Sequence, residues 1–205
     1  MRELVSNSRN LSMYRIIYSI FKRIGLINLG SLRQQLLPKL RGKILDIGVG
    51  DAGNYRYYPK SATVTILDYE KRMLEFAKKT IPTKKNSTFI HGDGQNLSIL
   101  KSESFDAVVV VFIYCCSVSN TVTALKEAKR VLKKNGRMIV IAHVVSKNWI
   151  LRMHQYVMQP FSRLVIGSDM ARDTRSDILK AGFKIIEERT TGWTDVFKLF
   201  IAKRK

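Results

Sequence analysis

A glycine-rich turn near residue 50 carries the residues whose types and spacing are most informative about chemistry. The stretch reads Ile44-Leu45-Asp46-Ile47-Gly48-Val49-Gly50-Asp51-Ala52-Gly53. Glycines that directly follow a strand allow the backbone to turn sharply and to approach a ligand where a Cβ would collide. The spacing matches the dinucleotide fingerprint, a pattern that is weak on its own. Asp46 favours a ligand that carries positive charge, since a pyrophosphate would be repelled by a carboxylate at this turn.

Two further acids are predicted to lie at the ends of neighbouring strands. Asp68 ends a second apolar run, 18 residues past Gly50, where a carboxylate can accept hydrogen bonds from both hydroxyls of a ribose. Asp93 follows a third run, and a carboxylate there can hold the amino group of adenine. We expect the adjacent Tyr69 and Gly94 to border the same ligand. The three acids thus form a row along the carboxyl edge of the predicted sheet, where open α/β sheets bind their ligands.

The elements that must position these residues alternate between strands and helices from residue 44 onward, which predicts an α/β fold with a mainly parallel sheet and helices on both faces. The predicted strands are 44–47, 64–67, 88–90, 107–112, 137–142, 183–188 and 197–202. The predicted helices are 70–79, 124–132, 151–158 and 173–181. We expect Asn135-Gly136 to cap the second of these helices, Pro160 to end the third and Gly182 to cap the fourth.

The length and composition predict one folded domain, residues 43–205, preceded by a basic extension over residues 1–42. The chain has 205 residues, of which 45% are hydrophobic, enough for a sizeable core. In the extension, apolar residues recur at helical spacing between basic ones over residues 13–27. This pattern is typical of a helix packed across a ligand cleft, and a basic helix on an anionic membrane surface is the alternative. Charges interrupt the stretch too often for it to cross a membrane.

Further motifs follow the glycine-rich turn in a recognisable order. They are Leu67-Asp68, Gly92-Asp93-Gly94, Ser104-Phe105-Asp106-Ala107-Val108 and the stretch from Leu125 to Gly136. Together with Asp46-Ile47-Gly48-Val49-Gly50, this series resembles the class I S-adenosylmethionine (SAM)-dependent methyltransferases over residues 43–142. The chain departs from the family pattern where Lys134 and Asn135 replace the proline and a glycine of the "RVLKPGG" turn, and where Ala52 replaces a third motif glycine.

The resemblance implies a Rossmann-like seven-stranded sheet, SAM as the cofactor and methyl transfer as the reaction. The residues that it assigns to cofactor binding are Asp46, Gly48, Gly50, Asp68, Tyr69, Asp93, Gly94 and Tyr114. Tyr114 follows the fourth predicted strand, and we expect it to pack on the adenine or to border the methyl group.

The second half of the chain is similar to the methyltransferase-like thiol S-methyltransferases, membrane-associated enzymes that methylate small thiols. The similar segments are Cys116-Ser117-Val118, His143-Val144, Trp149, 155–160, Gly167, Arg172 and Ala181-Gly182-Phe183. The chain differs from them because Ala142 and Ile166 replace acids and because its N-terminal segment is shorter and more basic. Quinone and phospholipid methyltransferases share the motifs nearly as well. We therefore expect a thiol, a quinone or phenol, or a phospholipid amine as acceptor, at a membrane surface.

Methyl transfer is an in-line displacement, in which holding the two reactants in line contributes up to about 7–11 kcal/mol. A thiol or phenol must also lose a proton, for which a nearby histidine is the usual agent. His143 follows the fifth predicted strand at the ligand edge and is the candidate, with a hydrogen-bonded structural histidine as the alternative. His154 and Gln155 are candidates to line the acceptor pocket, and no metal site is predicted.

The formal net charge of +20 is the feature that favours other partners, because a positive surface attracts nucleic acid, anionic lipid or acidic proteins. An RNA (rRNA or tRNA) methyltransferase is therefore one alternative, and a non-catalytic SAM-binding partner subunit is another. The chain has Phe112-Ile113-Tyr114-Cys115 where enzymes that methylate a base amine usually carry an Asn/Asp-Pro-Pro-aromatic turn. We thus favour a small-molecule or lipid substrate over nucleic acid. Residues 1–27 are the candidate contact with an anionic membrane, in a cytoplasmic and peripheral setting.

Overall fold

The computed structural model describes residues 20, 23, 28–81, 86–112, 120–165 and 169–205. Within them, seven strands form one sheet in the order β3-β2-β1-β4-β5-β7-β6. Strands β1 to β5 pair in parallel, and β7 runs antiparallel to both β5 and β6. The strands are β1 (Lys43–Ile47), β2 (Thr63–Asp68), β3 (Ser87–His91), β4 (Phe105–Val111), β5 (Leu132–His143), β6 (Phe183–Thr190) and β7 (Phe197–Arg204). The predicted mainly parallel, seven-stranded sheet is confirmed.

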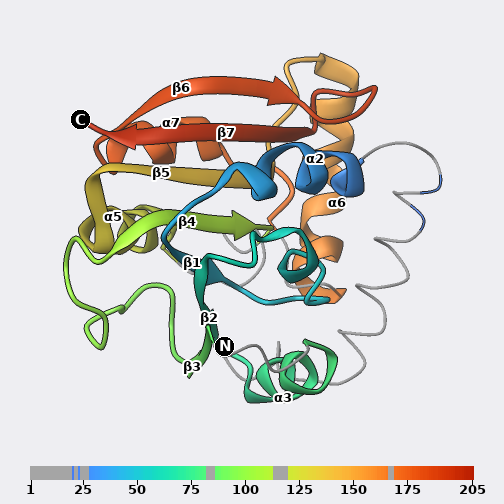
Figure 1. Ribbon diagram of the computed structural model, residues 1–205. Coiled ribbons are helices and arrows are strands. Elements are labelled where there is room, and N and C mark those ends of the chain that lie inside the picture. The colour runs from blue at the N-terminus through green and yellow to red at the C-terminus, as the bar shows by residue number, and fades with distance from the viewer. Residues whose placement is uncertain (1–19, 21–22, 24–27, 82–85, 113–119, 166–168) are drawn as a thin grey trace.

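Helices cover both faces of this sheet (Figure 1). They are α2 (Leu29–Leu36), α3 (Lys71–Thr80), α5 (Thr121–Val131), α6 (Trp149–Val165) and α7 (Thr174–Lys180), with short 3₁₀ turns η2 (Leu37–Lys39) and η3 (Tyr55–Tyr57). Successive strand residues point to opposite faces, so Ile44 packs with α2 and α3 while Leu45 packs with α5 and α7. The central strands read as continuous apolar runs because both of their faces are buried.

Helix α2 shows that part of the predicted extension belongs to the folded core. The Oδ1 atom of Asn28 accepts a hydrogen bond from the Ser31 amide at 3.1 Å and thereby caps the helix. Leu29, Leu32 and Leu36 are buried against one face of the sheet. Residues 28–42 therefore lead into β1 as part of the folded core, and their leucines share a hydrophobic cluster with residues of β1 and β2. The predicted helix over 13–27 lies outside the described residues, apart from positions 20 and 23.

The predicted cap at Asn135-Gly136 is wrong, because α5 ends at Val131 and β5 begins at the next residue. Leu132 pairs with Phe105 across the β4–β5 ladder, and both side chains are buried in the same core. The ladder then shifts in register before the next pair, so the Asn-Gly dipeptide lies in an irregular part of the strand. Strand pairing and burial of Leu132 override the turn preference of the dipeptide.

The prediction that Pro160 ends its helix is also wrong, since α6 continues to Val165. A proline inside a helix cannot donate to the carbonyl four residues earlier, here that of Tyr156. Both residues lie on the exposed side of α6, where water can reach that carbonyl. The predicted left-handed cap at Gly182 is confirmed, with φ +83°. Among the described residues, no helix has the length and apolar character needed to cross a membrane.

Candidate active site

The turn after β1 presents its backbone at the carboxyl edge of the sheet. The amide of Gly48 donates to the carbonyl of Leu67 at 2.7 Å, which holds the turn against the end of β2. Gly48 and Gly50 have φ values of +81° and +50°, a region that glycine enters without steric cost. A Cβ built at Gly50 would meet no atom within 4 Å, so the main chain at this point faces open space. A ligand can approach the backbone there.

Ala52 adopts the left-handed conformation that the family pattern fills with glycine. Its φ is +57°, and its amide donates to the carbonyl of Val49 at 2.8 Å. For an L-residue with a Cβ this conformation costs roughly 1–2 kcal/mol. The turn therefore has the backbone conformation that glycine would adopt, although the residue is alanine, and this conformation is slightly strained.

Asp68 joins the turns that follow β1 and β2. Its Oδ2 atom accepts a hydrogen bond from the Val49 amide at 2.8 Å, and its Oδ1 atom accepts one from the Glu70 amide at 2.8 Å. Burial raises the pKa of this carboxyl above its usual range, although the backbone donors act in the opposite direction. Two carboxylate oxygens offer about four lone-pair sites, so capacity remains for ligand hydroxyls beside the backbone donors Val49, Glu70 and Gly50.

The turn after β3 lies beside that of β2. The Gly92 amide donates to the carbonyl of Asp68 at 3.0 Å. Asp93 follows, and its Oδ1 atom accepts from the Gln95 amide at 2.8 Å. The side-chain oxygen of Gln95 in turn accepts from the amide of Asn120, the N-cap of α5, at 2.9 Å. The predicted row of acids therefore lies on three adjacent strands whose turns are hydrogen-bonded to one another.

Gly94 and Tyr69 lie at the same edge, as predicted from their neighbours. A Cβ at Gly94 would come within 3.2 Å of Cγ2 of Ile47, so glycine lets this turn lie against the end of β1. The Tyr69 side chain is exposed, and its carbonyl is 2.8 Å from Nε2 of His91. Tyr114 falls in the stretch 113–119, outside the described residues.

Asp46, the first acid of the row, is enclosed. Only 3% of the residue is exposed, and its carboxyl oxygens accept from Asn54 Nδ2 at 3.2 Å and from the Tyr58 hydroxyl at 2.9 Å. Burial raises the pKa of Asp46 to about 7, even though both hydrogen bonds favour the charged form. The structure thus shows Asp46 holding the turn from within, and its direct contact with a ligand stays a prediction.

Arg33 of α2 extends this buried cluster to the N-terminal part of the chain. Its Nε donates to Oδ1 of Asn54 at 2.8 Å, and its Nη2 pairs with Oδ1 of Asp51 at 3.2 Å. A Cβ at Gly53 would lie 2.5 Å from Nη1 of Arg33, so a side chain there would displace the guanidinium. Sequence reasoning did not single out Arg33, Asn54 or Tyr58, because no local pattern links α2 to the glycine-rich turn.

His143 ends β5 and is packed between aromatic rings. Its ring makes edge-to-face contacts with Phe112 at 5.5 Å and with Phe197 at 4.2 Å between centroids. Burial lowers the pKa of His143 to about 4, so the imidazole is neutral at pH 7. A neutral imidazole has one acceptor nitrogen, and the low pKa makes it a weak base. The geometry agrees with a structural role as well as with a catalytic one.

The structure separates the two residues predicted to line an acceptor pocket. Gln155 is 2% exposed, and its amide group accepts from Ser146 N at 2.8 Å and donates to the carbonyls of Val144 and Met170, each at 2.9 Å. These backbone contacts use the amide to anchor α6, and the place of Gln155 in an acceptor pocket stays a prediction. His154 points the other way and is exposed.

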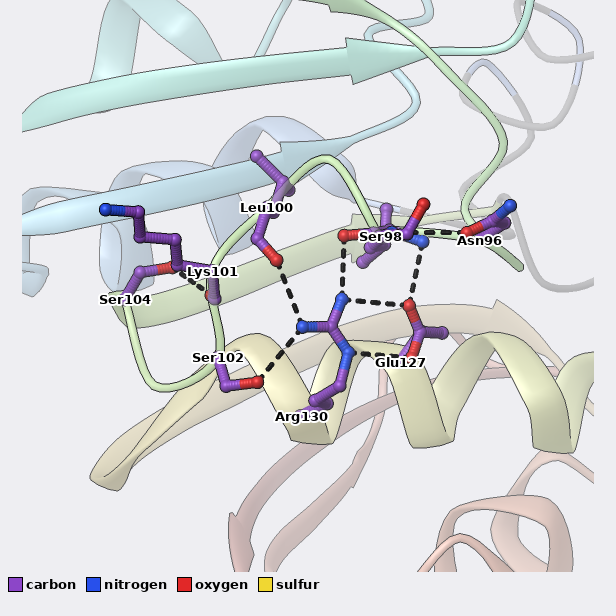
Figure 2. A network of polar contacts seen from close by, with 9 residues as sticks. Asn96, Ser98, Leu100, Lys101, Ser102, Ser104, Glu127 and Arg130 are labelled. Carbon is purple, nitrogen blue, oxygen red and sulfur yellow. Dashed lines mark hydrogen bonds and ion pairs between the residues drawn. The ribbon is translucent and has the colours of Figure 1, made fainter.

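Part of the basic surface serves internal structure. Figure 2 shows Arg130 between Glu127 and the loop of residues 96–104. Its guanidinium donates to the carbonyls of Leu97 at 2.7 Å and Leu100 at 3.0 Å, and its Nε pairs with Glu127 at 2.9 Å. Lys133 likewise pairs with Asp106 at 2.7 Å. Two of the six Lys and Arg residues between positions 126 and 137 therefore make internal contacts.

The residues at the carboxyl edge fit SAM. The spare lone pairs of Asp68 suit ribose hydroxyls, the Asp93 carboxylate suits an exocyclic amine, and the open backbone at Gly50 leaves room for the ligand. The carboxylates also give this edge a negative potential, which favours a sulfonium and an ammonium over a pyrophosphate.

Comparisons with known proteins agree with this fit. A family model described as a methyltransferase domain matches residues 45–140. The chain is 29% identical over 149 residues to a thiol S-methyltransferase of Rattus norvegicus, covering 70% of this chain and 61% of that protein. It is 35% identical over 102 residues to a demethylmenaquinone methyltransferase of Thermotoga maritima, covering 48% and 42% of the two chains. The chain thus spans about three fifths of the length of the rat relative.

Solved structures show the same fold. A SAM-dependent methyltransferase of Thermotoga maritima superposes with a TM-score of 0.70 at 24% identity and covers 100% of both chains. The apo form of the SAM-dependent methyltransferase SibL gives a TM-score of 0.70 at 21% identity, covering 94% of this chain and 57% of the other. The matched residues 45–140 and the strand order show that the chain contains a methyltransferase domain with the class I SAM-dependent methyltransferase fold.

Proposed function

We propose that the chain binds SAM at the carboxyl ends of β1, β2 and β3 and transfers its methyl group to a small or lipophilic acceptor. The observation that carries this proposal is the set of three turns joined through Gly48, Asp68 and Gly92. When bound, SAM supplies a methyl group made electrophilic by its positive sulfonium. The names of the matched relatives, thiol S-methyltransferase and demethylmenaquinone methyltransferase, support a thiol or a quinone as acceptor.

Each acid of the row has a distinct task in this proposal. Asp68 accepts from the ribose hydroxyls with the lone pairs that its two backbone donors leave over. Asp93 accepts from the adenine amino group, next to Tyr69 and Gly94. Asp46 keeps the glycine-rich turn in place through Asn54 and Tyr58 and, when ionised, adds negative charge beneath it.

His143 has its proposed task on the acceptor side of the site. A thiol or phenol reacts after losing its proton, and neutral His143 at the end of β5 offers a nitrogen to receive it. Because burial lowers the pKa of the imidazole to about 4, proton transfer to it is least unfavourable from the more acidic acceptors. Thiols lose their proton near pH 8.5 and phenols near 10, so a thiol suits His143 better.

The net charge of +20 favours RNA as the alternative acceptor, since phosphate neutralisation requires Lys and Arg. The internal pairing of Arg130 and Lys133 removes part of that argument. The same charge supports a membrane-surface setting, in which residues 1–27 and the anionic headgroups attract each other.

The test supplies the full chain with methyl-labelled SAM and four acceptors in parallel: a small thiol, a reduced quinone, phospholipid vesicles and RNA. We expect label in the thiol or the quinone and none in RNA. Asp68→Ala should abolish transfer to every acceptor, whereas Asp106→Ala, a carboxylate at the other end of the sheet, should retain it. Label that appears only in RNA would refute the proposal of a small or lipophilic acceptor. SAM binding without transfer to any acceptor would indicate the non-catalytic alternative.

A further inference from the structure

Helix α6 exposes an apolar face along its whole length. The exposed side chains recur three or four residues apart and cover about 140° of the helix circumference at 100° per residue. Trp149 at its start is 67% exposed and Leu164 near its end is 78% exposed. Figure 1 shows α6 running along the side of the molecule toward which β4 points. The face consists of Trp149, Met153, Tyr156, Val157, Phe161 and Leu164.

The opposite face of α6 is polar and fixed to the protein. Gln155 and Ser162 are both buried, and Gln155 makes three hydrogen bonds to backbone atoms. One turn further on, Nε2 of Gln159 donates to Oδ1 of Asp169 at 2.8 Å. The helix therefore buries Gln155 and Ser162 and leaves the large apolar side chains of its other face exposed. Rotating it to bury the apolar face would break the contacts that hold it, so this face is a stable surface feature.

Basic residues border the apolar face. Arg152 and Arg163 lie on one margin, Lys147 precedes the helix, and α6 contains no acidic residue. Arg163 also pairs with Asp169 at 2.9 Å, just beyond the helix. A second tryptophan, Trp193, is 72% exposed in the β6–β7 loop. That loop is tied to the start of α6, because Oδ2 of Asp195 accepts from the Lys147 amide at 2.6 Å.

We propose that this face of α6 docks on the surface of an anionic lipid bilayer. An apolar stripe rich in Trp, Phe and Leu, with basic residues at its margin, is the arrangement of helices that lie in the plane of a membrane interface. Arg152 and Lys147 then reach the lipid phosphates while the apolar side chains enter the acyl boundary. The net charge of +20 adds attraction over the rest of the molecule.

Charge also argues against two other occupants of this face. A second copy would bring another net charge of +20 to a margin that is already basic. The N-terminal segment of the same chain carries nine Lys and Arg against one acid over residues 1–43. Both would place like charges together, whereas phosphate headgroups supply the opposite sign.

This inference rests on the proposed function, and it names the surface through which the protein would contact a membrane. Helix α6 begins six residues after His143, the last residue of β5. Docking through α6 brings the acceptor side of the site close to the bilayer. A lipophilic acceptor then reaches the site from the membrane, while the acid row at β1 to β3 receives its cofactor from water.

The chain provides its own probe, because Trp149 and Trp193 are its only two tryptophans. The experiment adds the full chain to vesicles of phosphatidylcholine alone and to vesicles that also contain phosphatidylglycerol, and follows tryptophan emission and flotation. We expect a blue shift, quenching by lipids with brominated chains, and flotation with the anionic vesicles. Flotation without a change in tryptophan emission would place the contact elsewhere, for example in residues 1–27, and would overturn the proposal.

A variant pair provides the control. Val157→Glu with Leu164→Glu should weaken the partition onto anionic vesicles about 100-fold, at about tenfold for each apolar side chain withdrawn from lipid. Ile99→Glu makes the same kind of change at a residue that is 69% exposed on the β3–β4 loop, and should float like the wild type. Equal flotation of the wild type, the double variant and Ile99→Glu would overturn the proposal. It would also be overturned if none of them bound vesicles and the double variant changed from dimer to monomer, because the α6 face would then be a contact between two copies of the chain.

Methylation of a water-soluble thiol and SAM binding by calorimetry, measured on the same proteins, separate this inference from the proposed function. The double variant should retain both, because its side chains point away from the sheet. Docking with no methyl transfer to any acceptor would refute the proposed function alone. Methyl transfer with no docking would refute the α6 inference alone.

Discussion

The carboxyl edge of β1 to β3 and the exposed face of α6 are built in opposite ways. At the carboxyl edge, backbone amides donate hydrogen bonds to carbonyls and carboxylates within each turn and between neighbouring turns. The main chain therefore shapes the site. On α6, a polar face anchors the helix and leaves an apolar face uncovered. The part of the molecule that we propose binds the cofactor is thus shaped by the main chain. The part that we propose meets the membrane is made from exposed side chains.

Burial also acts differently on the ionisable groups of the two sides. It raises the pKa of Asp46 to about 7 beneath the glycine-rich turn, and it lowers the pKa of His143 to about 4 on the side where we propose that the acceptor binds. Near neutral pH the first group is therefore balanced between two states, whereas the second stays neutral. The cofactor side should respond to pH around 7 and the acceptor side should not.

The largest effect is expected from Asp68→Ala. The change removes acceptors for Val49 and Glu70 and for the proposed ribose contacts, and hydrogen bonds to a charged group contribute about 1.5–3 kcal/mol each. We expect SAM affinity to fall by at least about 100-fold in calorimetry. Circular dichroism should show an intact fold, and unchanged affinity would mean that the cofactor lies elsewhere.

His143→Gln tests the acceptor side. If His143 receives the proton, the turnover number for a thiol should fall about 100-fold, near the lower limit for general base catalysis because the group is a weak base. SAM affinity should stay at the wild-type value. An unchanged turnover number would assign His143 to the aromatic packing with Phe112 and Phe197 only.

Arg33→Leu tests whether α2 supports the cofactor side. Loss of the contacts with Asn54 and Asp51 loosens the glycine-rich turn, and we expect SAM affinity to fall about tenfold. Arg41→Leu is the matched control, since Arg41 is also basic and in the same segment but, within the part of the chain that the structure describes, donates to the carbonyls of Pro38 and Leu40 and not to the glycine-rich turn. Equal losses in both variants would point to general charge rather than to this contact.

The pH dependence of SAM binding should follow Asp46. Its raised pKa means that its stabilising contribution to the fold is fully present below 3.8 and is lost as the pH rises through about 7. Ionised Asp46 favours a cationic ligand, so SAM affinity should drop about tenfold for each pH unit below that value, measured by calorimetry. Asp46→Asn should remove the dependence, and a dependence that persists in this variant would contradict the assignment.

Ala52→Gly should have the smallest effect. Glycine relieves the strain of φ +57° but adds freedom to the unfolded chain, so the free energy of unfolding should rise by only about 0.5 kcal/mol. Thermal unfolding measures the change. A loss of stability would show that the Cβ of Ala52, which is buried, contributes more through packing than the turn costs.

The sequence predicted most strands closely because buried parallel strands give continuous apolar runs between polar turns. It failed at Asn135-Gly136 and at Pro160, where strand pairing and solvent access outweighed local preferences. The acids Asp68 and Asp93 were predictable because they end such runs. Arg33, Asn54 and Tyr58 were not, since their contacts join segments that no periodic pattern connects. The backbone partners of Gln155 were not predictable either, because they lie in segments before and after its helix.

The most direct test of the cofactor site is a crystal structure of the full chain with S-adenosylhomocysteine. We predict that both ribose hydroxyls lie within hydrogen-bond distance of the Asp68 carboxylate and that the adenine amino group lies near Asp93. A ligand bound away from the turns of β1, β2 and β3, with Asp68 bonded only to Val49 and Glu70, would contradict it.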